Sequence, residues 1–527
     1  MSVQLDSSRL DPGLSSSATQ TATQGYWEDP RAESEALTTP GDLNENPLPS
    51  SATEATQLTF AATPRQAVDG AIPIDGSSTN QPERTQGKTP DGKTIQIDPL
   101  HEGEQGTIAR ERTIANAGFG QTYVSSDQLV LTTGNGSDTV GVTQRDDGTV
   151  DVDVNGEQYE VRLAEGQELT IRSGDGNDTI NVAANVKVNI VVDGGAGDDN
   201  ITTGAGDDRI DGGLGNDTVS TGAGRDDLFG NSGIDELDAG AGDDVVYGGD
   251  GDDDLLGGDG VDFIEGGQGK DRLDGGAGQD MLSGGLDDDT LTGGAGNDRI
   301  YTGNGKDTVE AAAGDVVYAQ TVTDIINAAS GAKPTVINVE ISTAKGVTIE
   351  GSEAFRQRVG AEIEFLRSSP NGQRMLAEFD AAAANGNTVT IRELSNEQNG
   401  YAQTLGRGNA EISNGKAGEG SDVVISYNPS FHMAEFPAPS VVLYHEMSHA
   451  YNGVNGTFQP GTYRGTGPDS GQVPNAERQA VGLETSATPF DFDKNASTPA
   501  TSANPDHLTE NGMREELGLP DRPNYTL

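Results

Sequence analysis

Two of the five histidines in the 527-residue chain lie four residues apart, in the stretch VVLYHEMSHAYNG at residues 441–453. On a helix, His445 and His449 would share one face and bring two imidazole nitrogens onto a single metal ion. Glu446 would project beside them, close enough to take a proton from a water molecule at that metal without being a ligand. This HExxH pattern predicts a zinc centre that activates water. The alternative is an amphipathic helix with two surface histidines.

A catalytic zinc site needs a third protein ligand and an open fourth position for water. Because the chain contains no cysteine, that ligand has to be histidine, glutamate or aspartate. The favoured residue is Glu477, in the segment VPNAERQAVGLE, where a second helix is expected. Its Asn-x-Glu context is similar to that of proteases whose third ligand is glutamate. Asp469, Glu484 and His507 compete with it, and Glu477 could instead cap or salt-bridge its own helix.

A zinc centre with this set of residues indicates an enzyme that hydrolyses peptide bonds. Zinc would acidify its bound water and polarise the carbonyl, while Glu446 takes the proton and returns it to the leaving amine. The developing oxyanion also needs a hydrogen-bond donor opposite the metal. We select Tyr463, in a Gly- and Pro-rich loop that could shape substrate access or be an ordinary surface loop. The donors considered are Tyr463, Arg464, Tyr451, Arg478 and Tyr525.

The elements that position these residues belong to a mixed α/β segment, residues 336–527. The helix of the two histidines is expected to begin near Pro439 or Ser440. Upstream, VTIEG predicts a strand, and the next residues predict a helix, a turn at SPNG and a second short helix. TVTIREL and SDVVISYNP predict further strands. The terminal LTENGMREELGLP predicts a helix capped by Thr509 and by Gly518, with structural support as its role.

Three stretches of this segment, LYHEMSHAYN, PNAERQAVGL and LTENGMREELGLPDRPNY, resemble the M91 family of zinc metallopeptidases. That family includes type III effectors that cleave host signalling proteins. The resemblance implies a zincin-like metallopeptidase domain over about 336–527 and a protein substrate, such as a host signalling protein. It also implies that His445 and His449 are zinc ligands and that Glu446 is the catalytic base. Glu477 is assigned from its place in the motif.

The middle of the chain is a nine-residue repeat. Residues 194–310 divide without a gap into thirteen copies of GGxGxDxUx, where U is aliphatic. Glycines at positions one, two and four allow strained turns, and each x-U-x triplet is a minimal strand with one inward side chain. Two copies would form one turn of a right-handed parallel β-roll. Thirteen copies would give six and a half turns, a rod ~30 Å long at ~4.8 Å per turn.

The sixth position of every copy is aspartate, so stacking would align carboxylates along both edges of the roll. Such ladders repel unless a hard, oxygen-seeking cation lies between them, with turn carbonyls as the other ligands. Calcium suits this flexible geometry better than magnesium. The predicted calcium ligands are Asp199, Asp208, Asp217, Asp226, Asp235, Asp244, Asp253, Asp262, Asp271, Asp280, Asp289, Asp298 and Asp307.

The nonapeptide is identified as that of the RTX (repeats-in-toxin) family. The resemblance implies calcium-driven folding after export by a Gram-negative bacterium. In a calcium-poor cytosol the acidic repeats should stay unfolded, and such a chain can be threaded through bacterial secretion machinery. The repeats lapse after residue 310, which predicts a polar cap and linker at 311–335.

The composition and charge of the chain exclude several classes of protein. The formal charge of −53 excludes ordinary nucleic-acid binding, which depends on Lys and Arg, and it requires bound cations to limit self-repulsion. The apolar runs are shorter than the ~18 residues that a membrane span needs, so we expect a soluble chain without a transmembrane segment. With only 32% hydrophobic residues, one apolar core through the whole chain is implausible, and a multidomain arrangement is expected.

Residues 1–118 are rich in Ser, Thr, Gln, Pro and charge, and we predict a disordered leader. Residues 119–193 are predicted to be β-rich, with two diverged copies of the repeat, TGNGSDTVG and SGDGNDTIN. The N-terminus lacks the basic start and apolar core of a cleavable general secretory signal peptide. Its composition resembles the leaders of type III effectors, while type I export, which reads a C-terminal signal, is the alternative.

Two functions are compatible with these features. In the first, the protein is an exported, effector- or toxin-like zinc endopeptidase with a calcium-folded RTX module. In the second, it is an extracellular calcium-binding structural or adhesive protein whose C-terminal domain binds metal but cuts nothing. The intact HExxH with a plausible third ligand favours the first, because a non-catalytic domain has no need of Glu446.

Overall fold

The computed structural model describes residues 71–78, 85–89, 93–118, 121–328, 331–394, 400–404, 410–430, 438–492 and 499–525. All of them belong to one structural unit, which includes Pro64–Leu527. The first 70 residues, which make up most of the predicted leader, lie outside the described residues. Within the described part, none of the helices is both long enough and apolar enough to cross a membrane.

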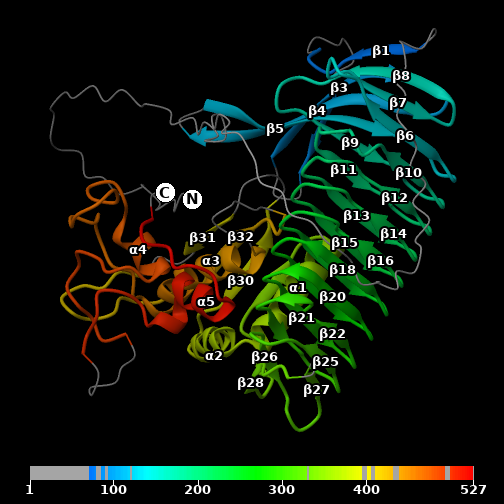
Figure 1. The fold of residues 1–527 in the computed structure, drawn as a ribbon. Coiled ribbons are helices and arrows are strands. Elements are labelled where there is room, and N and C mark those ends of the chain that lie inside the picture. Colours follow the sequence, from blue (N-terminus) through cyan, green and yellow to red (C-terminus); the bar gives the residue numbers. More distant parts are fainter. Residues whose placement is uncertain are drawn as a thin grey trace, which may run out of the picture. The chain divides into compact units, whose positions relative to one another are not determined.

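Two long sheets, each of fourteen strands, form a β-roll through the first part of the described chain (Figure 1). The first sheet contains, in spatial order, β1 (Ile72–Asp75), β8 (Glu157–Arg162), β7 (Val150–Val154), β6 (Thr139–Gln144), β10 (Thr179–Val182), β12 (Asn200–Thr202), β14 (Thr218–Ser220), β16 (Glu236–Asp238), β18 (Asp254–Asp259), β20 (Arg272–Gly278), β22 (Thr290–Thr292), β25 (Thr308–Ala311) and β27 (Ile325–Ala328), with β23 (Ala295–Gly296) beside β20.

The second sheet contains, in spatial order, β2 (Thr85–Lys88), β3 (Thr94–Glu102), β4 (Thr107–Gly118), β5 (Gln121–Thr132), β9 (Glu168–Arg172), β11 (Ile190–Asp193), β13 (Arg209–Leu214), β15 (Asp227–Ser232), β17 (Val245–Asp250), β19 (Phe263–Gln268), β21 (Met281–Leu286), β24 (Arg299–Tyr301), β26 (Val316–Ala319) and β28 (Thr335–Asn338).

Successive strands of the repeat region alternate between the two sheets and pair in parallel with the strand one turn away. Ile201 is aligned with Val219, and Val219 with Leu237, so each turn takes 18 residues, or two nonapeptides. The aliphatic residue at position eight of every copy lies in the core between the sheets and is at most 1% exposed. Burial of each such side chain contributes about 1.5–3 kcal/mol. The predicted parallel roll is therefore confirmed.

The glycine at position two shows why these turns need glycine. Gly213 has a φ of +105°, and a Cβ there would lie 2.1 Å from the carbonyl oxygen of Gly195 on the preceding turn. Any side chain at this position would both strain the backbone and separate the stacked turns. The glycine spacing thus sets how closely the turns stack.

The roll extends past both predicted boundaries. On its N-terminal side, β6 and β10 pair in parallel with each other, and β10 pairs with β12, so the two diverged copies are turns of the roll. On its C-terminal side, β26, β27 and β28 continue both sheets. The segment 311–335, predicted to be a polar cap and linker, therefore contributes strands to both sheets. The segment AAAGDVVYA loses the glycine pattern, and Ile300 is aligned with Val317 after 17 residues instead of 18. The alternation of inward apolar residues nevertheless continues, and Val317 and Ala319 are buried.

The predicted boundary at residue 118 is also wrong. Within the predicted leader, β1 pairs with β8, and β2, β3 and β4 pair antiparallel and continue onto β5. Alternating Ile and polar residues in β3 and β4 build this hairpin, and a buried Asp98 binds Arg112 across it at 2.8 Å. The composition averaged over 1–118 concealed this local alternation.

The C-terminal region is the predicted mixed α/β segment. Its four-stranded sheet has the order β29 (Thr348–Glu350), β30 (Val389–Glu393), β32 (Val423–Tyr427) and β31 (Gly400–Thr404). Its helices are α1 (Glu353–Ser368), α2 (Pro370–Ala384), α3 (Pro439–Asn455), α4 (Asn475–Val481), the short 3-10 helix η1 (Asp506–Leu508) and α5 (Glu510–Leu517). The predicted start of the histidine helix at Pro439 is confirmed, as are the Thr509 and Gly518 caps of the last helix.

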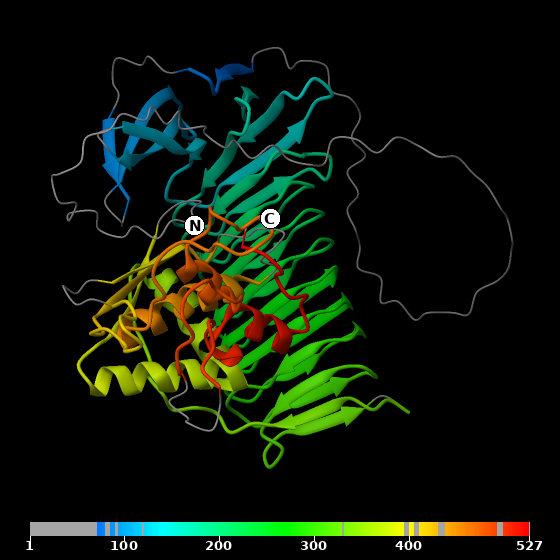
Figure 2. The same ribbon diagram turned by 90° about the vertical axis from the view of Figure 1, so that its left-hand side faces the viewer.

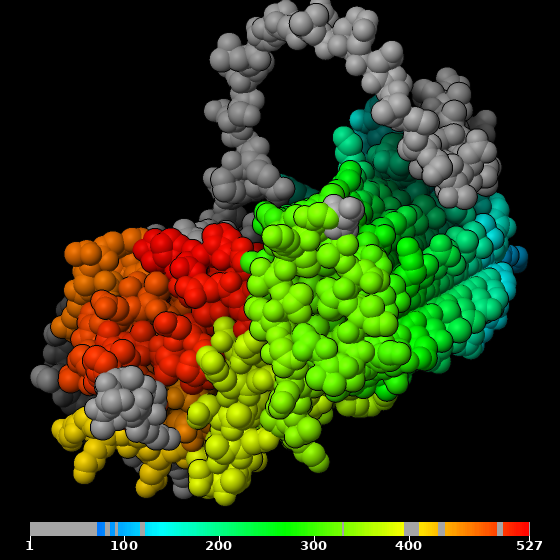
Figure 3. Space-filling view, turned by 60° about the horizontal axis from the view of Figure 1, so that its bottom comes forward, coloured from blue at the N-terminus to red at the C-terminus, as the bar shows by residue number. Residues whose placement is uncertain are grey.

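One apolar core joins this region to the roll. It contains residues of α1, α2, α3 and the small sheet together with aromatic residues on the outer side of the second long sheet. Figure 2 shows the helices lying along that side of the roll, and Figure 3 shows the two parts packed against each other. The elements that carry the candidate site are therefore supported by the roll.

Candidate metal centre

Helix α3 places both HExxH histidines in the interior. It begins at Pro439 and ends at Asn455, and its C-cap, Gly456, adopts the left-handed conformation. His445 is 0% exposed and His449 2% exposed, and their Nε2 atoms are 3.2 Å apart. The alternative of two surface histidines is excluded by this burial, and the two rings face a common point.

Helix α4 brings Glu477 to the same point. Its Oε2 atom lies 3.1 Å from Nε2 of His449 and 3.7 Å from Nε2 of His445. Ligands at zinc distances of ~2.0–2.1 Å in a tetrahedron stand roughly 3.3 Å from one another. The three ligand atoms have nearly that separation, so this donor set fits a zinc ion with one open position.

Glu510, at the start of α5, lies behind the first histidine. Its Oε2 atom is 2.8 Å from Nδ1 of His445, and its carboxylate is also held by Arg522 at 3.2 Å and Arg514 at 3.4 Å. A hydrogen bond donated by Nδ1 to this carboxylate leaves the Nε2 lone pair free for a metal. Sequence reasoning missed Glu510, because a glutamate directly after an N-cap is accounted for by the helix dipole alone.

The electrostatics of the pocket favour a positive charge. Burial lowers the pKa of His445, but hydrogen bonds to Glu477 and Glu510 outweigh it and raise the pKa to about 9. Burial alone would raise the pKa of Glu477, yet the two imidazoles hold it far below its ordinary value. A divalent cation would satisfy the same carboxylate and imidazole groups.

Glu446 is next to His445 on α3 and is 2% exposed. Its Oε2 atom is buried and has no hydrogen-bond partner among the described residues. Its charge contributes to the raised pKa values of His445 and Tyr525, which places the carboxylate beside the cluster. A buried carboxylate oxygen without a partner fits a group that acts on a bound water molecule.

Tyr525 reaches the cluster from the C-terminal segment. Its ring centroid lies 6.4 Å from that of His445, and its hydroxyl lies within the electrostatic influence of Glu477 and Glu446. Burial, with the charges of Glu477 and Glu446, raises its pKa well above the ordinary value, so the hydroxyl keeps its proton. Arg522 donates to the carbonyl of Tyr525 at 2.7 Å, and the backbone N–H of Tyr525 donates to Asp469 at 2.9 Å.

The other residues considered as the third metal ligand, Asp469, Glu484 and His507, do not belong to the cluster of His445, His449 and Glu477. Asp469 is fully buried, but its carboxylate binds Arg478 and the backbone of Tyr525. Glu484 is exposed, and neither it nor His507 belongs to the metal-ligand group found among the described residues. The arrangement therefore favours Glu477 as the third ligand.

The predicted oxyanion donor, Tyr463, is packed against another side chain. The guanidinium carbon of Arg478 lies 3.8 Å from its ring centroid, while Arg478 also binds Asp469. Arg464 is exposed and Tyr451 is buried within α3. Of the donors considered, Tyr525 is the one whose ring lies beside His445 and whose hydroxyl is influenced by the charges of Glu477 and Glu446, so the arrangement favours Tyr525 over Tyr463.

The thirteen predicted calcium ligands are all at most 2% exposed. One oxygen of each carboxylate accepts a backbone N–H from the neighbouring turn, as between Asp199 N and Asp217 Oδ1 at 2.9 Å. The other oxygen, Oδ2, is buried in all thirteen and has no hydrogen-bond partner in the part of the chain that the structure describes. A column of unsatisfied carboxylate oxygens is costly unless a cation is bound.

Backbone carbonyls complete this arrangement. A Cβ built on Gly248 would lie 2.4 Å from Oδ2 of Asp253 and 2.6 Å from the carbonyl oxygen of Gly266, so both oxygens face one small space. Burial raises the pKa of Asp253 to about 7 and that of Asp289 to about 10, and charges on neighbouring turns add to both shifts. Carboxylate and carbonyl oxygens around one space are the ligand set that calcium prefers.

The ladder also includes a residue that the predicted ligand set omitted. Asp178 holds the sixth position of the diverged copy SGDGNDTIN and is 2% exposed. It accepts the N–H of Asp138 at 2.7 Å, and its Oδ2 atom has no partner among the described residues. At the other end, Asp315 accepts the N–H of Asp298 at 3.1 Å. The sixth-position aspartate of the diverged copy was the signal that could have identified Asp178.

The fold and the site together define a protein with a calcium-binding repeat roll and a second domain that carries a candidate metal centre. Comparison with protein families assigns both parts. Residues 343–525 match the model of the M91 peptidase family, which is described as an effector protein. Residues 193–317 match the RTX calcium-binding nonapeptide repeat in six overlapping stretches. Both resemblances are therefore confirmed: the protein joins an RTX roll to an M91 effector domain.

Searches of curated proteins and of solved structures found no match to the chain.

Proposed function

We propose that the protein is an exported zinc-dependent endopeptidase that cleaves a protein substrate. The observation that carries this proposal is the convergence of His445, His449 and Glu477, with the unpartnered carboxylate oxygen of Glu446 beside them. Family membership supports a peptidase of the effector class and a protein substrate. The RTX repeats and the effector domain also fit a secreted bacterial protein, and type III and type I export both stay possible routes.

The chain's own residues account for the proton movements. A zinc ion held by His445, His449 and Glu477 would supply a Lewis acid that acidifies water and polarises a peptide carbonyl. Glu446 takes the proton of the attacking water and delivers it to the nitrogen of the leaving amine. Glu510 holds His445 by its Nδ1 atom and so fixes the direction of its Nε2 atom.

Tyr525 supplies the hydrogen-bond donor for the developing oxyanion. Its protonated hydroxyl lies at the cluster, and the segment that carries it is held by Arg522 and Asp469. A donor that is already in place when charge develops lowers the barrier without reorganisation of the site. This assignment replaces the sequence prediction of Tyr463.

The test compares the wild-type protein with Glu446→Ala and Glu446→Gln, purified with calcium and zinc. Incubation with a host-cell lysate, followed by mapping of new protein N-termini, should reveal cleavage products for the wild type alone. All three proteins should contain one zinc per chain, because Glu446 is not a ligand. Equal cleavage by wild type and Glu446→Ala, or no zinc in any of them, would contradict the proposal and leave the calcium-binding adhesive function.

A further inference from the structure

Apolar side chains follow the outer face of the second sheet with the period of the roll. Positions seven and nine of alternate nonapeptides, from the fourth to the twelfth copy, supply Phe229, Val245, Tyr247, Phe263, Met281 and Tyr301. These side chains are buried, but they belong to the core shared with the C-terminal region, not to the core of the roll. The same positions on the first sheet are mostly polar, as at Thr218, Glu236 and Arg272.

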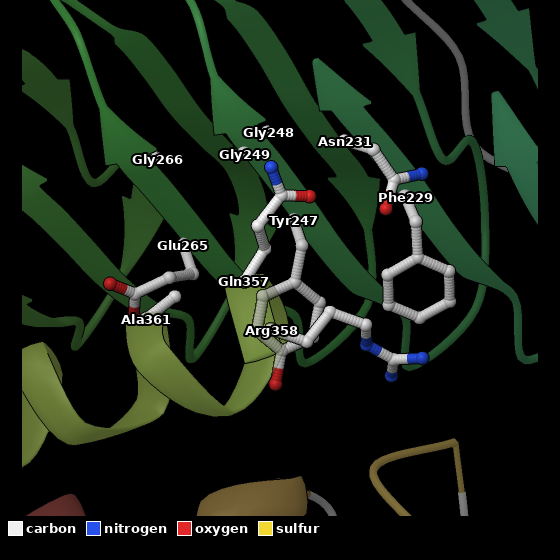
Figure 4. A pocket seen from close by; sticks show the side chains of 10 residues that line it. All are labelled: Phe229, Asn231, Tyr247, Gly248, Gly249, Glu265, Gly266, Gln357, Arg358 and Ala361. Carbon is white, nitrogen blue, oxygen red and sulfur yellow. The ribbon is translucent and has the colours of Figure 1, made fainter. Parts of the chain in front are cut away.

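Helix α1 covers this face. The ring of Phe365 stands edge-on to Tyr301, with centroids 4.8 Å apart, and also contacts Phe263 at 6.1 Å. In Figure 4, Gln357 and Arg358 project from α1 toward the strands, and the guanidinium carbon of Arg358 lies 3.3 Å from the ring centroid of Phe229. The aromatic pairs and the cation–π contact fix the position of α1, and so of the C-terminal region, on the outer face of the roll.

Helix α5 makes a second and more specific contact with the roll through Glu516. The hydroxyl of Tyr301 donates to its Oε1 atom at 3.3 Å. The backbone carbonyl of Glu516 accepts from Arg299 at 3.2 Å and from the hydroxyl of Tyr318 at 3.4 Å. The donors lie on β24 and β26, and Arg299 directly follows the calcium-ladder residue Asp298 in the chain.

The same short helix carries Glu510, the residue that binds Nδ1 of His445. Glu510 and Glu516 lie on one eight-residue helix, so a shift of its C-terminal end also displaces its N-terminal end. The remaining carboxylate oxygen of Glu516 accepts the backbone N–H of Asn371 at 2.9 Å. Helix α5 thus connects strands of the calcium ladder directly to the proposed zinc centre.

We propose that Glu516 is a positioning residue through which calcium controls the zinc centre. Calcium orders β24 and β26, these strands hold α5 through Glu516, and α5 holds Glu510 against His445. Calcium then raises zinc affinity without contacting the zinc site, and by thermodynamic reciprocity zinc raises calcium affinity by the same factor. This inference rests on the proposed function, since it assumes that the cluster binds zinc.

The test measures zinc affinity in the full chain at two calcium levels. Protein freed of metal on a chelating resin is titrated with zinc against a zinc-selective chromophoric chelator, without calcium and with saturating calcium chloride. We expect calcium to tighten the apparent zinc Kd at least tenfold. Calcium affinity, followed by far-UV circular dichroism with and without zinc, should change by the same factor.

Glu516→Ala removes the carboxylate that accepts from Tyr301 and from the Asn371 N–H but keeps the backbone carbonyl bound by Arg299 and Tyr318. It is expected to reduce the ratio of the two zinc Kd values by about threefold or more, while the calcium-induced change in circular dichroism persists. Glu515→Ala is the matched control, because Glu515 is the exposed neighbour on the same helix and should keep the wild-type ratio. Glu516→Gln, which keeps an acceptor for Tyr301, should recover part of the coupling. The ratio of Kd values distinguishes positioning from a general loss of stability, which would weaken zinc binding equally at both calcium levels.

The outcomes separate the two proposals. If zinc binds equally well with and without calcium in the wild type, the coupling is overturned and the zinc site stands. If Glu516→Ala weakens zinc binding but leaves the ratio unchanged, Glu516 supports the fold and does not transmit calcium binding. If no zinc binds at either calcium level, the proposed function and the coupling both fail.

Discussion

The roll and the C-terminal region both bury carboxylates, but they neutralise them differently. Among the described residues, each ladder aspartate of the roll keeps one carboxylate oxygen without a protein partner. In the C-terminal region, Glu510 is held by His445 and two arginines, and Glu477 is held by two imidazoles. The roll therefore needs external cations to fold, whereas in the folded protein the side chains of the metal centre hold one another before zinc binds.

The two ways of neutralising buried carboxylates fit two roles: calcium-driven folding for the roll and proposed catalysis for the C-terminal region. A repeat whose charge is balanced only by calcium can stay unfolded where calcium is scarce and fold where it is abundant. A catalytic site needs ligands held in place by surrounding hydrogen bonds, because small displacements reduce activity strongly.

Removal of calcium should unfold the roll, because its carboxylate columns would then face one another without counterions. The far-UV circular dichroism spectrum should lose its β-sheet signal and regain it cooperatively on addition of calcium. Magnesium at the same concentration serves as the control and should restore little of the signal, since it demands a tight octahedron. A spectrum that stays the same after calcium removal would contradict the ladder.

Tyr525→Phe should lower kcat about 10²–10³-fold, the usual cost of removing one oxyanion donor, with little change in KM. Zinc content should stay at the wild-type level, because the phenol is not one of the three proposed ligands. Tyr463→Phe is the matched control and should change kcat less than twofold. The opposite ranking of these two variants would restore the original sequence prediction.

Glu510→Ala should weaken zinc binding about 10–100-fold, because the hydrogen bond that orients His445 is lost. Competition with a zinc chelator at saturating calcium measures this effect. The exposed Glu515→Ala variant controls for changes in the charge of α5. Unchanged zinc affinity in Glu510→Ala would show that His445 is oriented by other contacts.

Glu362 on α1 makes the interface between the domains sensitive to pH. Burial raises its pKa to about 7, although Arg358 and the hydroxyls of Tyr427 and Tyr247 partly oppose this shift. Because the folded-state pKa exceeds the ordinary value, the contribution of Glu362 to stability is complete below about pH 4.5 and is lost as the pH rises through about 7.

Glu362→Gln should therefore stabilise the calcium-loaded protein at pH 8 relative to pH 5.5, each compared with the wild type, by about 1–2 kcal/mol. Denaturant titration followed by tyrosine fluorescence measures the difference. Glu353→Gln, at an exposed position on the same helix, should show no such pH dependence. A wild-type stability that does not change between these pH values relative to Glu362→Gln would contradict a buried, ionising carboxyl group.

Much of the molecule could be predicted because its information is local. Each nonapeptide contains its own turn, strand and metal ligand. The parallel roll and its carboxylate columns could therefore be predicted from the repeat alone, without knowledge of the tertiary contacts. The helical spacing of His445 and His449 likewise placed two imidazoles on one face, and Thr509 and Gly518 marked the ends of α5. The predicted boundaries of the roll and of the leader differ from the structure where the sequence lacks the glycine and aspartate pattern but keeps the apolar alternation, as in β26 and β3.

The repeat architecture, its cation chemistry and the histidine pair follow from the amino-acid sequence alone, because they depend on the spacing of neighbouring residues. Which distant residues complete the metal centre depends instead on the tertiary packing. Glu477, Glu510 and Tyr525 come from three separate segments, and their convergence depends on how α3, α4 and α5 pack against one another and against the aromatic face of the roll. That packing follows from burial of apolar surface, which no local pattern specifies.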